Sequence, residues 1–286
     1  DDNQHQYHET ILDTLLDIKN GNAFIIALSA LIKRLAVDRL HVVGDIFDRG
    51  PRADSILDML MEHHSVDIEW GNHDILWMGA ASGSLCCIAA VVRNCLAYNN
   101  MQILENGYGI PLRPLTLFAE KLYPDLTPEK AALQAVSIMM FKLEGQLIKR
   151  NPSFQMEDRL LLERISPAQK TVEMDNYVWP IRDIALPTID WADPYALTEE
   201  EQEVMNGLQD AFLHSLRLRT HVEFLYTRGR LYRRYNGNLL FHGCIPLDEN
   251  GEFLEKQLGN QTLSGKALMD YADSMARKAY FTGRQD

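Results

Sequence analysis

Two short apolar segments of this chain each end abruptly in side chains that bind metals. The first is residues 41–50, His-Val-Val-Gly-Asp-Ile-Phe-Asp-Arg-Gly, and the second is residues 70–74, Trp-Gly-Asn-His-Asp. A short apolar run is typical of a strand buried in an α/β sheet, and such sheets place their binding groups at the carboxyl ends of the strands. A third segment, residues 239–246, reaches a single histidine in the same way. The pattern therefore predicts a sheet edge that carries carboxylate, amide and imidazole groups.

These groups suit a pair of divalent cations. A two-metal site needs one carboxylate that can bridge the ions, and we assign this role to Asp45, because Gly44 before it has no side chain to keep an ion from the backbone. The amide oxygen of Asn72 and the imidazole of His242 can complete one ion, since oxygen and neutral nitrogen ligands suit manganese, iron or zinc. The competing interpretation is a polar surface loop or, for His242, a buried core histidine.

The remaining side chains of the first two segments suit hydrolysis of a phosphate ester. Arg49 carries a planar guanidinium that can hold two phosphate oxygens at once. His73 can give a proton to the departing oxygen, a role that typically contributes about 10²–10⁴-fold in rate. Asp48 can orient that imidazole. We therefore expect three catalytic residues, His73, Asp48 and Arg49, beside three metal ligands, Asp45, Asn72 and His242.

Residues 44–50 and 71–74 together are similar to the core motifs of calcineurin-like metallophosphatases. The flanking segments resemble more narrowly the class III fructose-1,6-bisphosphatases of bacteria, from about residue 23 to the end of the chain. The segments that carry this resemblance are 70–79, 141–144, 148–152, 156–163 and 235–251. The resemblance implies an α/β fold, a calcineurin-like metallophosphatase sandwich with a large helical insertion. It also implies manganese as the metal, fructose 1,6-bisphosphate as the substrate and a role in gluconeogenesis.

The sequence departs from the superfamily pattern in two places. Members begin the site with an Asp-x-His motif and close it with a Gly-His motif, whereas none of the nine histidines here stands in either context. The resemblance also implies a longer chain on both sides. We therefore expect residues 1–286 to be the central portion of one catalytic domain, with the other metal ligands outside it. An inactive fragment is the alternative.

The charge of the chain favours a small partner. A net charge of −12 disfavours nucleic acid, which is bound mainly through Lys and Arg. No apolar stretch approaches the roughly 18 residues that span a membrane, and no signal peptide is evident, so we expect a cytoplasmic protein with no membrane partner. Four cysteines without a metal-site or disulfide-like spacing fit a reducing compartment. Self-association as a homo-oligomer is possible.

Hydrophobic periodicity predicts the order of the first elements. These are helices at 11–19 and 23–35, a strand at 40–44, a helix that begins at Pro51, and a strand at 66–70. The apolar residues of the third helix that we expect to face inward are Ile56, Leu57, Leu60 and Met61.

A mostly helical insertion is expected from about residue 75 to 220. Its clearest helices are predicted at 129–149, 156–163 and 199–218, the last with Thr198 and Glu201 as an N-terminal capping pair. Residues 222–226 and 231–235 are expected to form a hairpin around residues 227–230, followed by the strand that reaches His242.

Basic residues in this predicted hairpin raise a further possibility. Arg228, Arg230, Arg233 and Arg234 lie close together in the sequence, and we assign Arg233 and Arg234 to binding the second phosphate of a sugar bisphosphate. The alternative is a solvated hairpin face. Protein serine/threonine phosphatases and dinucleoside polyphosphate hydrolases could use the same two-metal chemistry, so the motifs alone leave the substrate open.

Overall fold

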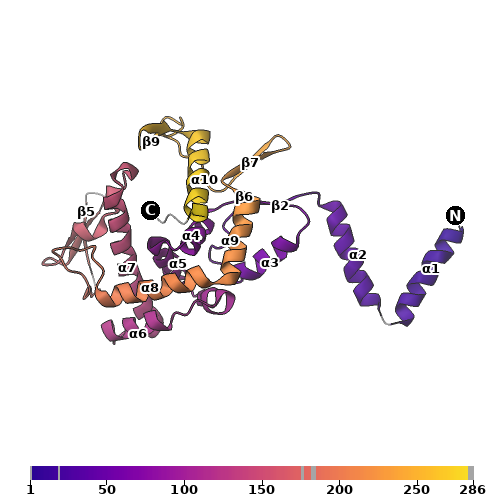
Figure 1. Cartoon of the computed structure of the whole chain (residues 1–286), viewed down its shortest axis with the longest axis horizontal. Coiled ribbons are helices and arrows are strands. Elements are labelled where there is room, and N and C mark those ends of the chain that lie inside the picture. The colour runs from indigo at the N-terminus through magenta and orange to yellow at the C-terminus, as the bar shows by residue number, and fades with distance from the viewer. Residues whose placement is uncertain (1, 19, 175–176, 182–184, 283–286) are drawn as a thin grey trace. The chain divides into compact units, whose positions relative to one another are not determined.

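The computed structural model describes residues 2–18, 20–174, 177–181 and 185–282. The chain forms two compact units, and Figure 1 shows the course of the backbone through both. The first unit comprises Asp1–Val42 and Glu62–Asp67, and the second comprises Val43–Met61 and Ile68–Asp286. The described helices include none that is both long enough and apolar enough to cross a membrane.

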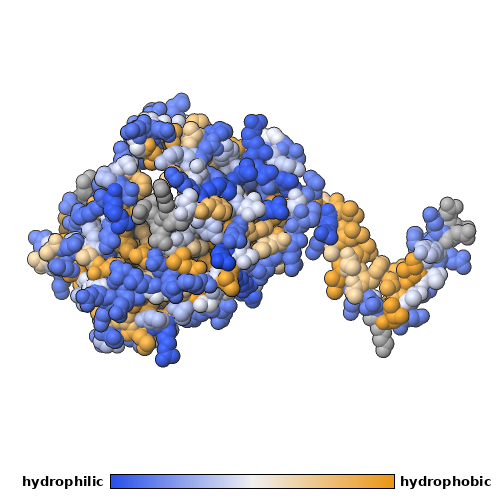
Figure 2. Space-filling view, viewed as in Figure 1, coloured by the Kyte–Doolittle hydropathy of each residue, from blue (hydrophilic) through white to orange (hydrophobic). Residues whose placement is uncertain are grey.

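The first unit begins with the two predicted helices. They are α1 (Asp2–Asp17) and α2 (Gly21–Ala36), and the predicted position 19 lies outside the described residues. No residue of α2 is buried, and Ile26 is 70% exposed although the helix is apolar on most of its surface. Figure 2 shows hydrophobic residues over this helix. A helix of this composition is usually buried against other protein.

The two segments that are predicted to bind metal follow strands of a three-stranded sheet of order β1-β2-β6. Its strands are β1 (Leu40–Val42), β2 (Val66–Glu69) and β6 (Gly229–Arg230), and β6 runs parallel to β2. The helix α3 (Ala53–Glu62) lies between β1 and β2 in the chain, so the predicted strand, helix and strand are confirmed.

The inward face of α3 was predicted only in part. Leu57 and Leu60 are buried, as expected. Ile56 and Met61 are 45% and 40% exposed, so their predicted burial is wrong. The helix begins at Ala53 rather than at Pro51, and the amides of Ser55 and Ile56 donate to the carbonyl of Arg52. The buried stripe of this short helix is therefore narrower than its apolar sequence suggested.

A helical layer forms most of the rest of the second unit. Its helices are α4 (Asn72–Ala81), α5 (Leu85–Ala97), α6 (Arg113–Leu122), α7 (Pro128–Arg150), α8 (Glu199–His214) and α9 (Leu216–Arg228), with a π-helix at Ile103–Gly107. Helix α7 packs against α5 and α6, and Ile88, Leu115 and Met139 are fully buried in this core. The helix predicted at 199–218 is interrupted at Ser215, which separates α8 from α9.

The predicted insertion also contains strands. Residues 156–163 form short 3₁₀ turns, η3 (Glu157–Arg159) and η4 (Leu161–Arg164), instead of the predicted helix. They follow Gln155, whose backbone is left-handed with φ of 53°. An antiparallel sheet then follows, made of β3 (Ile165–Ser166), β4 (Thr171–Met174) and β5 (Tyr177–Pro180). The insertion is therefore mostly rather than wholly helical.

The predicted hairpin is displaced along the chain. Residues 222–226 lie inside α9, where Leu218, Val222 and Leu225 follow helical spacing and are fully buried. The observed hairpin pairs β7 (Tyr232–Tyr235) with β8 (Asn238–Phe241) around a turn at residues 236–237, both of which have positive φ. The chain continues through β9 (Lys256–Leu258) and β10 (Gln261–Leu263) to α10 (Gly265–Thr282).

A buried ion pair joins α7 to the start of α8. The Lys142 ammonium lies 2.7 Å from the Glu201 carboxylate and also donates to the Thr188 carbonyl at 2.6 Å. Both side chains of the pair are almost fully buried, at 0% and 1% exposure. Glu201 also accepts from the amide of Thr198, which confirms the predicted capping pair. One carboxylate thus caps a helix and neutralises a buried cation.

Candidate active site

The two segments that are predicted to bind metal meet directly at the end of the sheet. Gly44 has φ of 87°, and a Cβ built there would lie 2.5 Å from the Glu69 carbonyl oxygen and 2.6 Å from the Gly71 amide nitrogen. A Cβ at Gly71 would lie 2.1 Å from Oδ1 of Asp45. Only glycine permits so close an approach of the two backbones, so both glycines are needed to bring Asp45 against the second segment.

Asp74 holds the two segments together from below the surface. Its Oδ2 accepts from the amides of Asp45 at 2.8 Å and Gly71 at 2.9 Å, and its Oδ1 accepts from Phe47 at 3.2 Å. The side chain is fully buried, and burial raises the pKa of this carboxyl against the opposing effect of the three backbone donors. Asp45 itself has φ of 54°, a conformation that ordinary residues rarely adopt. Asp74 therefore stabilises a strained loop.

Three predicted site residues form one cluster of potential metal ligands. Asp45, Asp48 and His73 each offer an atom within 4.8 Å of the other two. Nε2 of His73 lies 3.0 Å from Oδ1 of Asp48, and the His73 amide donates to Oδ1 of Asp45 at 3.1 Å. Asn72, exposed at the start of α4, is adjacent to this cluster in the chain.

His242 reaches the cluster from the separate β7–β8 hairpin, not from the main sheet as its sequence pattern predicted. Its Nδ1 lies 2.7 Å from the Val43 carbonyl, so this nitrogen must donate, and Nε2 lies 3.1 Å from Oδ2 of Asp45. In the neutral imidazole Nε2 then carries no hydrogen, so Nε2 and Oδ2 of Asp45 are two acceptors that face each other. A metal-ligating histidine usually binds the ion through one ring nitrogen and donates a hydrogen bond from the other, often to a backbone carbonyl.

These separations fit a divalent cation. Ligand atoms at right angles on one octahedral ion, each about 2.1 Å from it, lie about 3 Å apart. The pair formed by Asp45 and His242, at 3.1 Å, has this separation. The oxygen and imidazole donors are also of the kind that manganese, iron and zinc accept. The residues present therefore fit a metal ion.

Arg49 lies beside this cluster on the exposed side. Its Nε is 3.6 Å from Oδ1 of Asp48, and its guanidinium stacks over the ring of Tyr98 at 4.5 Å from the centroid. The side chain is 64% exposed, so its remaining N–H groups can reach an incoming anion.

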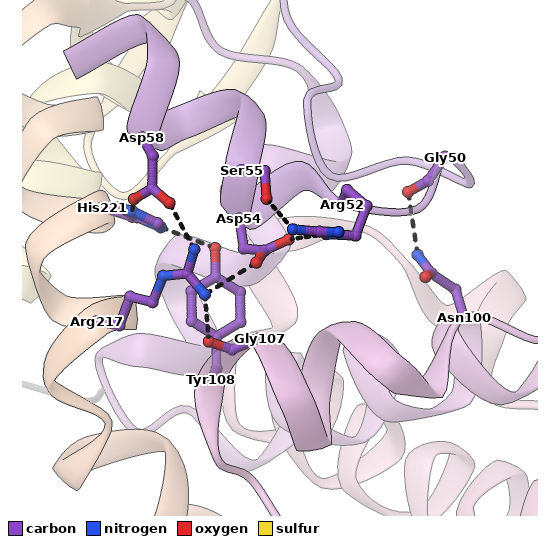
Figure 3. A network of polar contacts seen from close by, with 10 residues as sticks. All are labelled: Gly50, Arg52, Asp54, Ser55, Asp58, Asn100, Gly107, Tyr108, Arg217 and His221. Carbon is purple, nitrogen blue, oxygen red and sulfur yellow. Dashed lines mark hydrogen bonds and ion pairs between the residues drawn. The ribbon is translucent and has the colours of Figure 1, made fainter. Parts of the chain in front are cut away.

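A partly buried polar network supports the loop and the helix that follow Asp48 (Figure 3). The Asn100 amide donates to the Gly50 carbonyl at 3.1 Å. Arg217 of α9 pairs with Asp54 at 2.9 Å and with Asp58 at 2.5 Å, both on α3. The hydrogen bond from Arg217 is the main cause that lowers the pKa of Asp58. Helix α3 is thereby fixed to α9.

The same network engages a histidine that the sequence did not assign to a metal site. His221 is buried; its Nε2 lies 2.9 Å from Oδ1 of Asp58, and its Nδ1 lies 3.0 Å from the Tyr108 hydroxyl. Burial lowers the pKa of His221. This histidine therefore has a structural role.

The predicted substrate-binding residues lie elsewhere in the second unit. Arg233 and Arg234 are on β7 and border a cleft together with Arg230 and with Lys266 and Arg277 of α10. No sequence motif pointed to the α10 residues, because only the folded chain brings them to the hairpin.

Comparison with known proteins identifies the family. A sequence model of the Firmicute fructose-1,6-bisphosphatases matches residues 1–286. A class 3 fructose-1,6-bisphosphatase of Clostridium acetobutylicum is 47% identical over 97% of this chain, and one of Clostridium novyi is 45% identical over 98%. The chain spans about 45% of the length of these relatives. No solved structure matches it. The resemblance of the flanking segments to class III fructose-1,6-bisphosphatases is confirmed, and the chain belongs to the Firmicute fructose-1,6-bisphosphatase family.

Proposed function

We propose that the protein containing this chain hydrolyses fructose 1,6-bisphosphate to fructose 6-phosphate and phosphate. The observation that carries the proposal is the pair of contacts at one loop junction, Asp48 with His73 at 3.0 Å and Asp45 with His242 at 3.1 Å. The first pair suits proton transfer and the second suits metal binding. The relatives that share this sequence are named as fructose-1,6-bisphosphatases, which supports the choice of substrate.

Asp45, Asn72 and His242 would hold divalent cations in this proposal, and we propose manganese as the metal. When bound, such cations lower the pKa of water from 15.7 toward about 7 and withdraw charge from the phosphoryl oxygens. The donor set of carboxylate, amide oxygen and imidazole suits this ion. The fold we propose around it is the calcineurin-like sandwich, which the mixed α/β architecture accommodates.

Side chains of this chain bind the reacting phosphate and transfer the proton. Arg49 binds oxygens of the reacting phosphoryl group and so opposes the charge that gathers on them. As the oxygen of water bonds to phosphorus and the bond from phosphorus to the sugar oxygen breaks, His73 gives its proton to that sugar oxygen. Asp48, 3.0 Å away, orients the imidazole for this transfer. Arg233 and Arg234 are proposed to bind the second phosphate.

The proposed setting is the cytoplasm, where the reaction serves gluconeogenesis. The four cysteines have no disulfide-like spacing in the sequence, which supports this setting.

A substrate panel tests the proposal. The purified full-length protein with manganese should hydrolyse fructose 1,6-bisphosphate much faster than fructose 6-phosphate, a phosphoserine peptide or a dinucleoside tetraphosphate, with the product measured as inorganic phosphate for the first three substrates and as nucleotides for the last. A preference for the peptide or for the dinucleotide would replace the proposal by one of the other two phosphoesterase activities. If none of the four substrates is hydrolysed, the proposal that this protein is an enzyme is wrong.

A further inference from the structure

A basic cleft of about 680 Å³ lies between α10 and the segment formed by β6 and β7. This volume is in the range of small-molecule sites, which run from about 300 to 1,000 Å³. Five basic side chains line the cleft, namely Arg230, Arg233, Arg234, Lys266 and Arg277. Only two carboxylates do, Asp270 and Asp273, so the lining carries a net positive charge. The chain as a whole has a net charge of −12, and this local reversal of sign indicates an anionic ligand.

Both carboxylates are already engaged by the cations of α10. Asp273 accepts from Nε of Arg277 at 2.5 Å, and Asp270 pairs with Lys266 on the next turn. Arg277 is further occupied, because its two terminal nitrogens donate to the carbonyls of Tyr226 at 2.6 Å and Gly229 at 2.7 Å. Lys266 and Arg277 therefore build the wall of the cleft, and the excess positive charge comes from the arginines of β6 and β7.

Arg230 of β6 and Arg234 of β7 are exposed and border the cleft. Within the described residues, no carboxylate pairs with Arg230 or Arg234. Side chains of a strand alternate between its faces, so Arg234 shares a face of β7 with Tyr232, whose hydroxyl donates to Asp270 at 2.8 Å. That face is therefore turned toward α10 and the cleft. Arg233 also borders the cleft but makes an interaction of its own.

The cleft adjoins the candidate active site through the sheet. Arg230 is paired with Glu69 in the parallel ladder, and its carbonyl accepts from the amide of Trp70, the residue before Gly71. Arg277 stacks over the Trp70 ring at 4.9 Å from the centroid. The hairpin that carries Arg234 returns along β8 to His242. The basic wall and the metal-binding loops are thus connected by short, rigid segments.

We propose that this cleft is a phosphate-binding subsite, in which Arg230 and Arg234 bind one phosphate group of a small phosphorylated molecule. Guanidinium groups bind phosphate oxygens through charge-assisted hydrogen bonds. The phosphate belongs either to the far end of the substrate or to a separate phosphorylated metabolite. The first source rests on the proposed function, whereas the subsite itself does not.

The test uses the full-length protein with its metal and three variants: Arg230→Ala, Arg234→Ala, and the control Arg228→Ala. Arg228 is an exposed arginine at the end of α9 that does not border the cleft. Calorimetric titration with inorganic phosphate should show, besides binding at the metal site, a second binding event in the wild type that both cleft variants weaken by about tenfold or more. The control should retain it, and melting temperatures should be alike in all four proteins. A further variant, Arg234→Lys, keeps the charge and should retain part of the affinity that Arg234→Ala loses.

Steady-state kinetics identify the source of the phosphate. If it is the far end of the substrate, the cleft variants raise KM for fructose 1,6-bisphosphate about tenfold while turnover of an aryl phosphate, which has no second phosphate, stays unchanged. If it is a separate metabolite, both kinetic constants stay unchanged while the phosphate titration is lost. Cleft variants that titrate like the wild type overturn the subsite. A wild type that leaves the bisphosphate intact yet loses phosphate binding in the variants overturns only the proposed function.

Discussion

Replacement of Gly71 by alanine tests the contact between the two loops of the candidate site in isolation. Gly71 has φ of −83° and ψ of 170°, which any residue adopts, so the substitution introduces no backbone strain. The added Cβ would lie 2.1 Å from Oδ1 and 2.5 Å from the backbone nitrogen of Asp45. Contacts below about 3 Å do not persist, so one loop must move by up to about 1 Å. Backbone cannot yield as a flexible side chain can.

Such a displacement has two consequences. Overpacking at a tight contact costs about 1–3 kcal/mol of the free energy of unfolding. A shift of about 1 Å in a catalytic group lowers activity by about 10²-fold. We therefore expect Gly71→Ala in the full-length protein to lower kcat/KM by about that factor, with a reduced metal content measured by mass spectrometry.

The control for this substitution is Gly207→Ala. Gly207 lies in α8 with nothing within 4 Å of the added Cβ. Alanine there should leave activity unchanged and stabilise the protein by about 0.5–1 kcal/mol. If Gly71→Ala keeps wild-type activity and metal content, the two loops do not meet as described.

Three further substitutions or modifications test other parts of the structure. Glu201→Ala should lower the free energy of unfolding by about 3–5 kcal/mol in denaturant titration, because it leaves a buried lysine unpaired; a loss below 1 kcal/mol would mean that the pair is solvated. Burial raises the pKa of Cys86 and Cys95 to about 12, so iodoacetamide at pH 8 should label the exposed Cys244 in the native protein, with Cys86 and Cys95 labelled only after denaturation. Burial lowers the pKa of His221 below 6.5, so the unfolded chain binds this proton more readily, and stability should fall by up to about 1.4 kcal/mol per pH unit as the pH drops below about 6.5. The His221→Gln variant should lack this part of the pH dependence.

The candidate site was more accessible to sequence reasoning than the fold around it. Asp45, Asp48 and His73 stand in short motifs at strand ends, and a motif of this kind already specifies its local geometry. The structure brings these three side chains together, although their catalytic roles stay predictions. The position of His242 at a strand end was also evident, but its strand lies in a hairpin, because pairing partners depend on contacts distant in sequence.

The errors in the fold have specific physical causes. Residues 222–226 form a short run that is apolar except for Glu223, and such a run suits a strand or a buried helix equally well. The spacing of Leu218, Val222 and Leu225 decides for the helix. The actual hairpin turn is Asn236 and Gly237, a pair that favours the positive φ that both adopt. The basic cleft could not be predicted, because it needs α10 against β7.

The central claim is that Asp45 binds metal whereas His73 transfers a proton. Its most direct test is the metal content of Asp45→Asn and His73→Asn in the full-length protein, measured by mass spectrometry alongside turnover of fructose 1,6-bisphosphate. Both variants should lose activity, His73→Asn by about 10²–10⁴-fold. Only Asp45→Asn should lose metal, because His73 offers its imidazole to Asp48. Equal metal loss in the two variants would make His73 a ligand and contradict the proposed division of roles, and full metal retention in Asp45→Asn would contradict the site itself.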